Sequence, residues 1–354
     1  MRVIKIFLLF VCCISLDVQS QTFLSDTLGI NEDGSVIIAK SLALPGWILG
    51  VDVDSTDNLL FIRYRNLSKN ETSLKNRGGI SVYSLADQRM LWQRPVNYFN
   101  QDPKLTSEGV LFVTMGKATS LLDLKTGNEV WKKKKMIPYW VDAKNRMFLA
   151  YKGSYMNGVS NELEGHSLAT GEKMWSRKMS HVYGWNESGL LDDSTRLIVS
   201  DGIHLVHMGN GEGPSYAMPT GASDYKEAVA LGALGVVTGV LTGFAAVPTG
   251  PKKVMELVSN VLSDDTVFYV ASRENLFCLD RQLQPKWGYP IPDGMGSRSH
   301  LFARGDSLYM INMGTGYRNT IFDTSEAYAH EYLRLKVGWP FIACFDKRKG
   351  EKVW

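Results

Sequence analysis

Cysteine is scarce in this sequence, and neither sign of charge dominates. Only four of the 354 residues are Cys, and two of them, Cys12 and Cys13, lie near the amino terminus. The other two, Cys278 and Cys344, precede similar turns in two repeats, and neighbouring repeats should hold them beyond disulfide reach. We therefore expect two small buried core residues. The formal net charge is only +3, and the one basic cluster, Lys132 to Lys135, lies in a predicted outer strand, so no nucleic-acid partner is predicted.

Patterns that would indicate an enzyme are also missing. The chain has no nucleophile elbow, phosphate-binding loop or zinc-ligand spacing. His204 and His207 are three positions apart in a predicted strand, so their side chains point to opposite faces. The pairs Asp192–Asp193 and Asp264–Asp265 fall at predicted turns, where Asp bonds to local amides. We predict no catalytic, cofactor-binding or metal site.

The first 20 residues have the features of a secretory signal peptide. Arg2 and Lys5 precede an apolar run over residues 6–16, and a short stretch with small residues follows. The alternative is a lipoprotein anchor at Cys12 or Cys13, although the residues before these two positions suit lipidation poorly. We predict an exported protein that is periplasmic, bound to the cell envelope or secreted.

One phrase is repeated along the chain: a hydrophobic run, an Asp or Ser, a tight polar turn and then a Trp. The clearest copy runs from Asp123 through Gly127 to Trp131. Two similar copies contain Gly171 with Trp175 and Gly350 with Trp354, looser copies end at Trp92 and Trp287, and a degenerate copy ends at Tyr216. A repeat at this fixed spacing is the primary evidence on the architecture.

The spacing of the copies, about 40 residues, is that of a four-stranded propeller blade. Glycine in the turn accepts the positive φ of a tight hairpin, and a Trp on the next strand would bury its ring between neighbouring blades. We therefore predict an all-β fold, a β-propeller with six recognisable repeats. The Trp and Gly residues of the phrases are its predicted blade-docking residues.

These phrases resemble the tryptophan-docking repeats of the pyrroloquinoline-quinone-type propeller superfamily, over roughly residues 35 to 354. The resemblance implies an eight-bladed type of fold and two kinds of function, quinoprotein dehydrogenases and non-enzymatic outer-membrane assembly lipoproteins. The dehydrogenases hold their quinone against a vicinal disulfide beside a calcium ion. Here the only vicinal pair, Cys12–Cys13, lies in the segment predicted to be removed. The non-enzymatic branch is therefore favoured, with no cofactor.

Residues 33–40 form a predicted turn and strand with no partner strands in their own repeat. Propellers commonly close their ring by letting such an N-terminal strand complete the last blade. The chain also stops on a docking residue, Trp354. We expect residues 21–354 to form one propeller domain, either shortened at its C-terminus or imperfectly closed with six to seven blades.

Four inserts interrupt the repeat spacing, and they cover residues 63–79, 152–164, 223–256 and 314–336. Three fall between the predicted second and third strands of a blade, and one falls between blades. In an up-and-down blade all these connections emerge on the same face, where loops on a rigid scaffold usually carry recognition. This loop-rich face is the candidate working surface; drift of loop length without function is the alternative.

The insert at 223–256 contains an uncharged glycine-rich segment, residues 228–247, that is long enough to cross a membrane as a helix. Gly235, Gly239 and Gly243 would place a smooth helix-packing stripe on one face. A single crossing would divide a continuous ring between two sides of a bilayer. Three structures remain: a helical insert packed on the propeller, a helical hairpin in contact with a membrane, and a contact surface for a partner helix.

The last insert is rich in Tyr and Arg, which are frequent anchors of protein interfaces. Its candidate contact residues are Tyr317, Arg318, Tyr328, His330, Tyr332 and Arg334. A polar loop that covers the hub would use the same residues.

Together these features predict an exported non-enzymatic propeller that acts as a binding or assembly scaffold through one loop-rich face, with a protein partner. Two alternatives stay open. One is a degenerate quinone-dependent dehydrogenase, and the other is a membrane-associated propeller anchored by residues 228–247.

Overall fold

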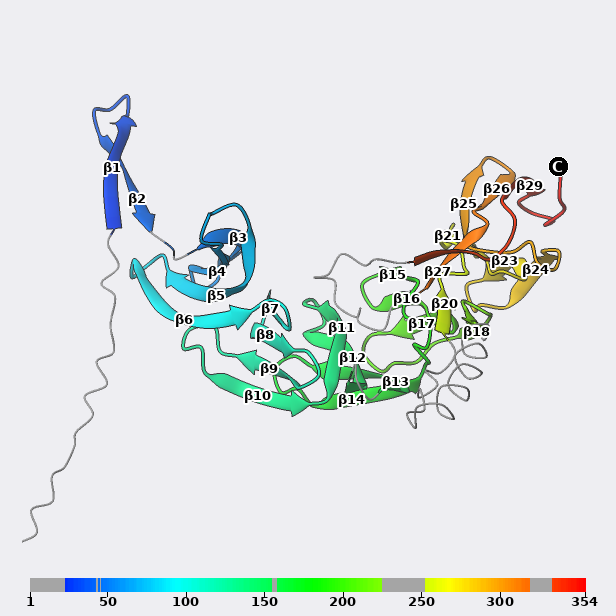
Figure 1. The fold of residues 1–354 in the computed structure, drawn as a ribbon, viewed down its shortest axis with the longest axis horizontal. Helices are drawn as coiled ribbons and strands as arrows, with labels where there is room; N and C mark the ends of the chain where they lie inside the picture. Colours follow the sequence, from blue (N-terminus) through cyan, green and yellow to red (C-terminus); the bar gives the residue numbers. More distant parts are fainter. Residues whose placement is uncertain (1–22, 43, 45, 155–157, 225–251, 319–332) are drawn as a thin grey trace, which may run out of the picture.

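The structure is a computed structural model that describes residues 23–354 except 43, 45, 155–157, 225–251 and 319–332. Within these residues every regular element is a β-strand, and most strands belong to four-stranded antiparallel sheets. The sheets follow one another along a curved row whose two ends do not meet in Figure 1. The predicted signal peptide lies outside the described residues.

Six sheets follow the six repeats in chain order and confirm the predicted blades. The first blade consists of β3 (Trp47–Asp54), β4 (Leu59–Leu67), β5 (Leu74–Ser84) and β6 (Arg89–Asn97). The second consists of β7 (Gln101–Thr106), β8 (Gly109–Thr114), β9 (Ala118–Leu122) and β10 (Glu129–Lys134). The third consists of β11 (Met136–Asp142), β12 (Met147–Ser154), β13 (Gly158–Ser167) and β14 (Lys173–Lys178). The fourth blade consists of β15 (Glu187–Leu190), β16 (Thr195–Val199), β17 (Gly202–His207) and β18 (Ser215–Ala217). The fifth consists of β21 (Leu262–Ser263), β22 (Val267–Ala271), β23 (Asn275–Asp280) and β24 (Pro285–Pro290). The sixth consists of β25 (Ser299–Arg304), β26 (Ser307–Asn312) and β29 (Phe341–Asp346).

Two further sheets lie outside this series. One is the hairpin of β1 (Phe23–Ile30) and β2 (Val36–Leu42), and the other joins β19 (Ala222–Asp224), β20 (Lys252–Met255), β27 (Thr315–Arg318) and β28 (Leu333–Lys336).

The N-terminal strand is not an orphan, which corrects the prediction. Residues 36–42 form β2, and β2 pairs along its length with β1. The turn between them is closed by a 2.8 Å hydrogen bond from the Asn31 amide to the Ser35 carbonyl, with Gly34 at a φ of +82°. The partner strand was missed because residues 23–30 lack a strong apolar alternation.

The hydrophobic core lies between blades, because the middle strands of each sheet are apolar on both faces. Five clusters of buried side chains each join two consecutive blades. Between the first and second blades, for example, Phe61 and Ile80 pack with Val110 and Leu122, and all four are at most 1% exposed. The same arrangement recurs at each junction, so each blade is stabilised by its neighbours.

Three of the predicted docking tryptophans lie against the turn of the following blade. The indole Nε1 groups of Trp92, Trp131 and Trp175 donate 2.8 Å hydrogen bonds to the carbonyls of Leu124, Leu168 and Met208, respectively. Each ring covers a turn glycine with a φ of +67° to +75° (Gly127, Gly171 and Gly211). A Cβ at Gly127 or Gly171 would lie 2.7 Å from the Trp ring, and one at Gly211 would lie 2.3 Å away. Glycine is required there for both φ and space.

The last two tryptophans are placed differently. The ring of Trp287 covers Gly350, but its Nε1 is buried without a hydrogen-bond partner. The carbonyl of Lys347, which corresponds to the acceptors in the other turns, instead accepts a 3.3 Å hydrogen bond from the Tyr269 hydroxyl. Trp354 is 58% exposed. Cys278 and Cys344 are buried and free of disulfides, as expected.

Candidate functional site

The stems of the inserts 223–256 and 314–336 meet in one sheet beside the last two blades (Figure 1). β19 pairs with β20 and β27 pairs with β28, each pair as an antiparallel hairpin. β20 and β27 then join the two hairpins through the pairs Val254–Arg318 and Met255–Tyr317. Backbone pairing therefore brings together two inserts that are far apart in the sequence. We call this sheet, β19-β20-β27-β28, the insert sheet.

Arg298 fastens the insert sheet to the sixth blade. Its guanidinium forms a 3.3 Å ion pair with Glu256, which directly follows β20. Its Nη1 donates a 2.9 Å hydrogen bond to the Tyr317 hydroxyl, and its charged carbon lies 5.0 Å from the centre of the Tyr317 ring. One cation thus contacts both inserts.

The predicted contact loop is described only at its two ends. Tyr317 and Arg318 lie in β27, Arg334 lies in β28, and Tyr317 and Arg334 are cross-strand partners. The remaining members, Tyr328, His330 and Tyr332, lie outside the described residues. The structure therefore joins the ends of this loop to the other insert, an arrangement that the loop's own sequence does not indicate.

The predicted helical insert is not supported. Its glycine stripe, Gly235, Gly239 and Gly243, lies outside the described residues. The described residues on either side of the predicted helical segment 228–247 are strands: residues 222–224 pair with residues 252–255, and residues 252–255 also pair with β27. Within the described part of the chain, no helix is long and apolar enough to span a bilayer.

A groove of about 300 Å³ opens beside the insert sheet. Three separate parts of the chain line it: Asn186 and Glu187 at the entry to the fourth blade, Glu256 and residues 258–260 after β20, and residues 298–300 with Met313 from the sixth blade. Most of its polar side chains already have partners. The Asn260 amide exchanges 3.0 and 2.8 Å hydrogen bonds with the backbone of Leu301.

Glu187 is the exception among the charged groups of the groove. Its carboxylate accepts a 2.5 Å hydrogen bond from the Val261 amide, and it has no ion-pair partner among the described residues. Burial raises the pKa of Glu187, while the Val261 hydrogen bond and the nearby His300 oppose that shift. The neighbouring Asn186 has both side-chain amide atoms buried without a hydrogen-bond partner. Such groups cost folding free energy unless something compensates them.

Residues 50–285 match the family model described as outer membrane protein assembly factor BamB. This chain belongs to the BamB family. The match covers most of the blades, and it identifies the repeats as those of the pyrroloquinoline-quinone-type propeller superfamily, in its BamB-like branch.

Several solved propellers are similar to the BamB-family chain at low sequence identity. BamB from Moraxella catarrhalis is 12% identical, with a TM-score of 0.31, over 79% of this chain and 86% of that one. The computationally designed protein Ika8 is 9% identical, with a TM-score of 0.35, over 88% and 86%. The C-terminal WD40 domain of Sif2 is 11% identical, with a TM-score of 0.34, over 84% and 75%. No curated protein matches the chain.

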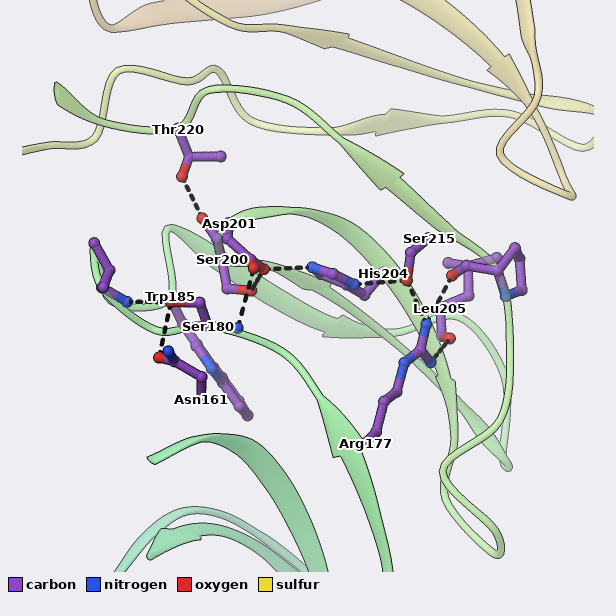
Figure 2. Close-up of polar contacts among 12 residues, drawn as sticks. Asn161, Arg177, Ser180, Trp185, Ser200, Asp201, His204, Leu205, Ser215 and Thr220 are labelled. Carbon is purple, nitrogen blue, oxygen red and sulfur yellow. Dashed lines mark hydrogen bonds and ion pairs between the residues drawn. The ribbon is translucent and has the colours of Figure 1, made fainter. Parts of the chain in front are cut away.

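A second polar cluster of this BamB-family chain surrounds His204 between the third and fourth blades (Figure 2). His204 is 6% exposed, its Nε2 lies 2.9 Å from Asp201 Oδ1 and its Nδ1 lies 2.8 Å from Ser215 Oγ. Asp201 also accepts a 3.1 Å hydrogen bond from the Ser180 amide of the preceding blade. Burial acts to raise the pKa of Asp201, but the hydrogen bonds from His204 and Ser180 outweigh it, so this pKa is lowered.

Arg177 completes the cluster from β14 (Figure 2). Its Nη1 donates a 2.6 Å hydrogen bond to the Leu205 carbonyl, and its Nη2 donates to the Gly213 carbonyl at 2.9 Å and to Ser215 Oγ at 2.5 Å. Arg177 thus holds the turn between β17 and β18 of the next blade. Burial lowers the pKa of this guanidinium.

The order Asp201, His204, Ser215 matches that of a hydrolytic triad, but its surroundings favour a structural role. His204 and Ser215 are directly opposite each other in the β17–β18 ladder, so their contact follows from strand pairing. Ser215 Oγ also accepts the Arg177 hydrogen bond, which occupies an electron pair that a nucleophile would need. We interpret the cluster as a latch between two blades.

The sequence did not indicate the groove or the latch. His207, paired with His204 in the sequence as a potential metal ligand, is exposed and its Nδ1 accepts a 3.2 Å hydrogen bond from the Gly209 amide. The described residues contain no group of three side chains suited to hold a metal ion. The residues that line the groove come from three repeats, and no local spacing connects them.

Proposed function

We propose that this chain is an exported, non-enzymatic propeller that acts as a binding or assembly scaffold in the cell envelope. Membership of a family described as outer membrane protein assembly factor supports an assembly role. The observation that carries the proposal is the insert sheet, in which two inserts far apart in the sequence form one structure on the blades. A signal peptide over residues 1–20 and a propeller domain over residues 21–354 belong to this proposal.

The physical argument is that the blades supply rigidity and the inserts supply recognition. Each blade is packed against its neighbours through a buried cluster, so the loops leave from fixed positions. The insert sheet and Arg298 hold together the strands that flank residues 225–251 and 319–332. We propose that these two segments, with Tyr317, Arg318 and Arg334 in the strands beside the second one, contact a protein partner.

The experiment uses the organism that carries the chain. Residues 225–251 and 319–332 are each replaced by a short Gly-Ser linker, and the abundance of β-barrel proteins in the outer membrane is measured by quantitative proteomics. We expect both variants to lower this abundance as much as loss of the whole chain does. The matched control replaces residues 55–57, in the turn between β3 and β4 of the first blade, by Gly-Ser-Gly. This turn leaves the blade on the face opposite the inserts, so the abundance should be unchanged.

Three outcomes would contradict the proposal. If loss of the whole chain changes no outer-membrane protein, the assembly role fails. If the purified chain binds pyrroloquinoline quinone and calcium saturably and reduces a dye with turnover, it is a degenerate quinone-dependent dehydrogenase. Flotation of the intact chain with liposomes, lost on replacement of residues 225–251, would identify the membrane-associated alternative.

A further inference from the structure

The groove beside the insert sheet contains a carboxylate, that of Glu187, without a countercharge among the residues that the structure describes. Glu187 lies in the wall of this groove of about 300 Å³ and is only partly exposed. Its single hydrogen bond, 2.5 Å from the Val261 amide, satisfies one carboxylate oxygen. No cation forms an ion pair with it among the residues that the structure describes. A carboxylate that has lost water and gained no countercharge is held at a cost in folding free energy.

The other charged groups of the groove do not supply that countercharge. Arg298 is committed to Glu256 at 3.3 Å and to the Tyr317 hydroxyl at 2.9 Å. His300 also lines the groove, is exposed and forms no ion pair with Glu187. The two carboxylates, Glu187 and Glu256, and the one guanidinium, Arg298, together carry one excess negative charge. A positively charged ligand is therefore favoured.

The remaining lining suits a small group on an apolar stem. Val258 and Met313 supply apolar surface, and Met313 is 49% exposed at the groove. The side chains of Ser259 and Ser299 are occupied by hydrogen bonds within the protein, the first with the Ala271 amide at 2.8 Å and the second with Asn312 Oδ1 at 3.1 Å. An alkyl chain that ends in a charged nitrogen fits this combination of apolar wall and unpaired carboxylate.

We propose that this groove binds a guanidinium or ammonium group on an alkyl chain, with Glu187 as its countercharge. The group reaches the site either as a free small molecule or as the Arg or Lys side chain of a partner protein. The variants that test this site leave residues 225–251 and 319–332 unaltered, so its test is independent of the proposed assembly role.

Isothermal titration calorimetry on the purified chain at low salt tests the site with two probes. One probe is agmatine, a free alkyl guanidinium, and the other is an acetylated and amidated Gly-Arg-Gly peptide. We expect saturable binding of at least one probe, weaker at high salt because the contact is ionic. Binding of agmatine indicates a site open to free cations, and binding of the peptide alone indicates a site for a partner's side chain.

Glu187→Gln is the decisive variant. Glutamine keeps an acceptor for the Val261 amide but removes the charge, so affinity should fall at least tenfold. Glu162→Gln is the matched control, because Glu162 is exposed in β13 and does not line the groove. This variant should bind the probes with the same affinity as the unaltered chain. Met313→Arg is a second variant that places the protein's own guanidinium at the groove, and it should abolish probe binding.

The proposal is overturned if the unaltered chain binds neither probe, or if Glu187→Gln binds as tightly as Glu162→Gln. A cooperative transition in thermal unfolding shows, for each variant, that the variant is folded. If Glu187→Gln does not fold, undiminished binding by Met313→Arg overturns the proposal in its place.

Discussion

The interface between the third and fourth blades and the interface between the fourth and fifth use the same geometry with different residues. In the first, the ring of Trp175 covers Gly211 and its Nε1 bonds to the Met208 carbonyl at 2.8 Å. In the second, Tyr216 replaces the Trp, and Leu283 stands in the turn at a φ of +59°. Leu283 is fully buried, and Tyr216 packs against its cluster.

This difference shows that the ring and the turn residue change together. The turn that contains Leu283 is one residue shorter, since Asp280 bonds to the Gln284 carbonyl where Asp123 bonds to that of Asn128. A Cβ at Gly211 would lie 2.3 Å from the Trp175 ring, whereas Leu283 is fully buried in the cluster against which the smaller ring of Tyr216 packs. A glycine is therefore needed in this turn only where the ring that packs on the turn is that of a Trp.

Removal of a docking Trp should have the largest effect. Trp175→Ala deletes a ring that is 8% exposed together with its hydrogen bond, and we expect a loss of about 3–5 kcal/mol in the free energy of unfolding. Urea denaturation followed by circular dichroism measures it. Trp354→Ala is the control, because this ring is 58% exposed. Equal losses of unfolding free energy in the two variants would show that the packing of the Trp175 ring between blades adds no more stability than an exposed Trp does.

A double-mutant cycle tests whether the ring and the turn residue are exchanged as a pair. Leu283→Gly alone empties a buried position and should cost about 2–4 kcal/mol. Tyr216→Trp alone overfills the same interface and should cost about 1–3 kcal/mol. Together the two changes should cost less than their sum by about 1 kcal/mol or more. Additive costs in urea denaturation would refute the pairing.

The requirement for glycine can be separated into backbone conformation and space. Gly211 has a φ of +75° and faces the Trp175 ring, so Gly211→Ala should lose about 1–3 kcal/mol from backbone strain, and more from the clash. Gly116 has a φ of +68° with nothing within 4 Å of an added Cβ. Gly116→Ala therefore reports the backbone part alone. Thermal unfolding of both variants should rank Gly211→Ala as the less stable, and a reversed order would contradict the steric argument.

The smallest expected effect distinguishes Trp131 from Trp287. The Nε1 of Trp131 donates to the Leu168 carbonyl at 2.8 Å, whereas that of Trp287 is buried without a partner. Phenylalanine removes this donor in both cases. Trp131→Phe should therefore be more destabilising than Trp287→Phe by about 1 kcal/mol, measured as the difference in urea denaturation. A greater loss for Trp287→Phe would mean that its indole nitrogen has a partner in solution.

Much of the fold follows from the sequence because the repeat is local. The turn from Asp123 to Gly127 specifies its own hydrogen bonds, since Asp123 Oδ1 accepts from the amides of Lys125 and Thr126 at 3.1 and 2.7 Å. Six such units with alternating apolar strands were enough to predict the blades. The hairpin partner β1 was missed because residues 23–30 lack a strong apolar alternation. The strands on either side of the predicted helical segment 228–247 were also missed, because β-pairing across a long insert has no local signature.

The sequence by itself determined the repeated blade, the turn glycines and the absence of a recognisable catalytic motif, because each depends on residues close together in the chain. Only the tertiary structure decided that two inserts share the insert sheet, that Arg298 contacts both of them, and that Glu187 lies in a groove without an ion-pair partner among the described residues. Their residues come from separate repeats. The physical reason is that contacts between such residues depend on how the blades stack, and stacking is decided by the packing of whole sheets rather than by any single segment.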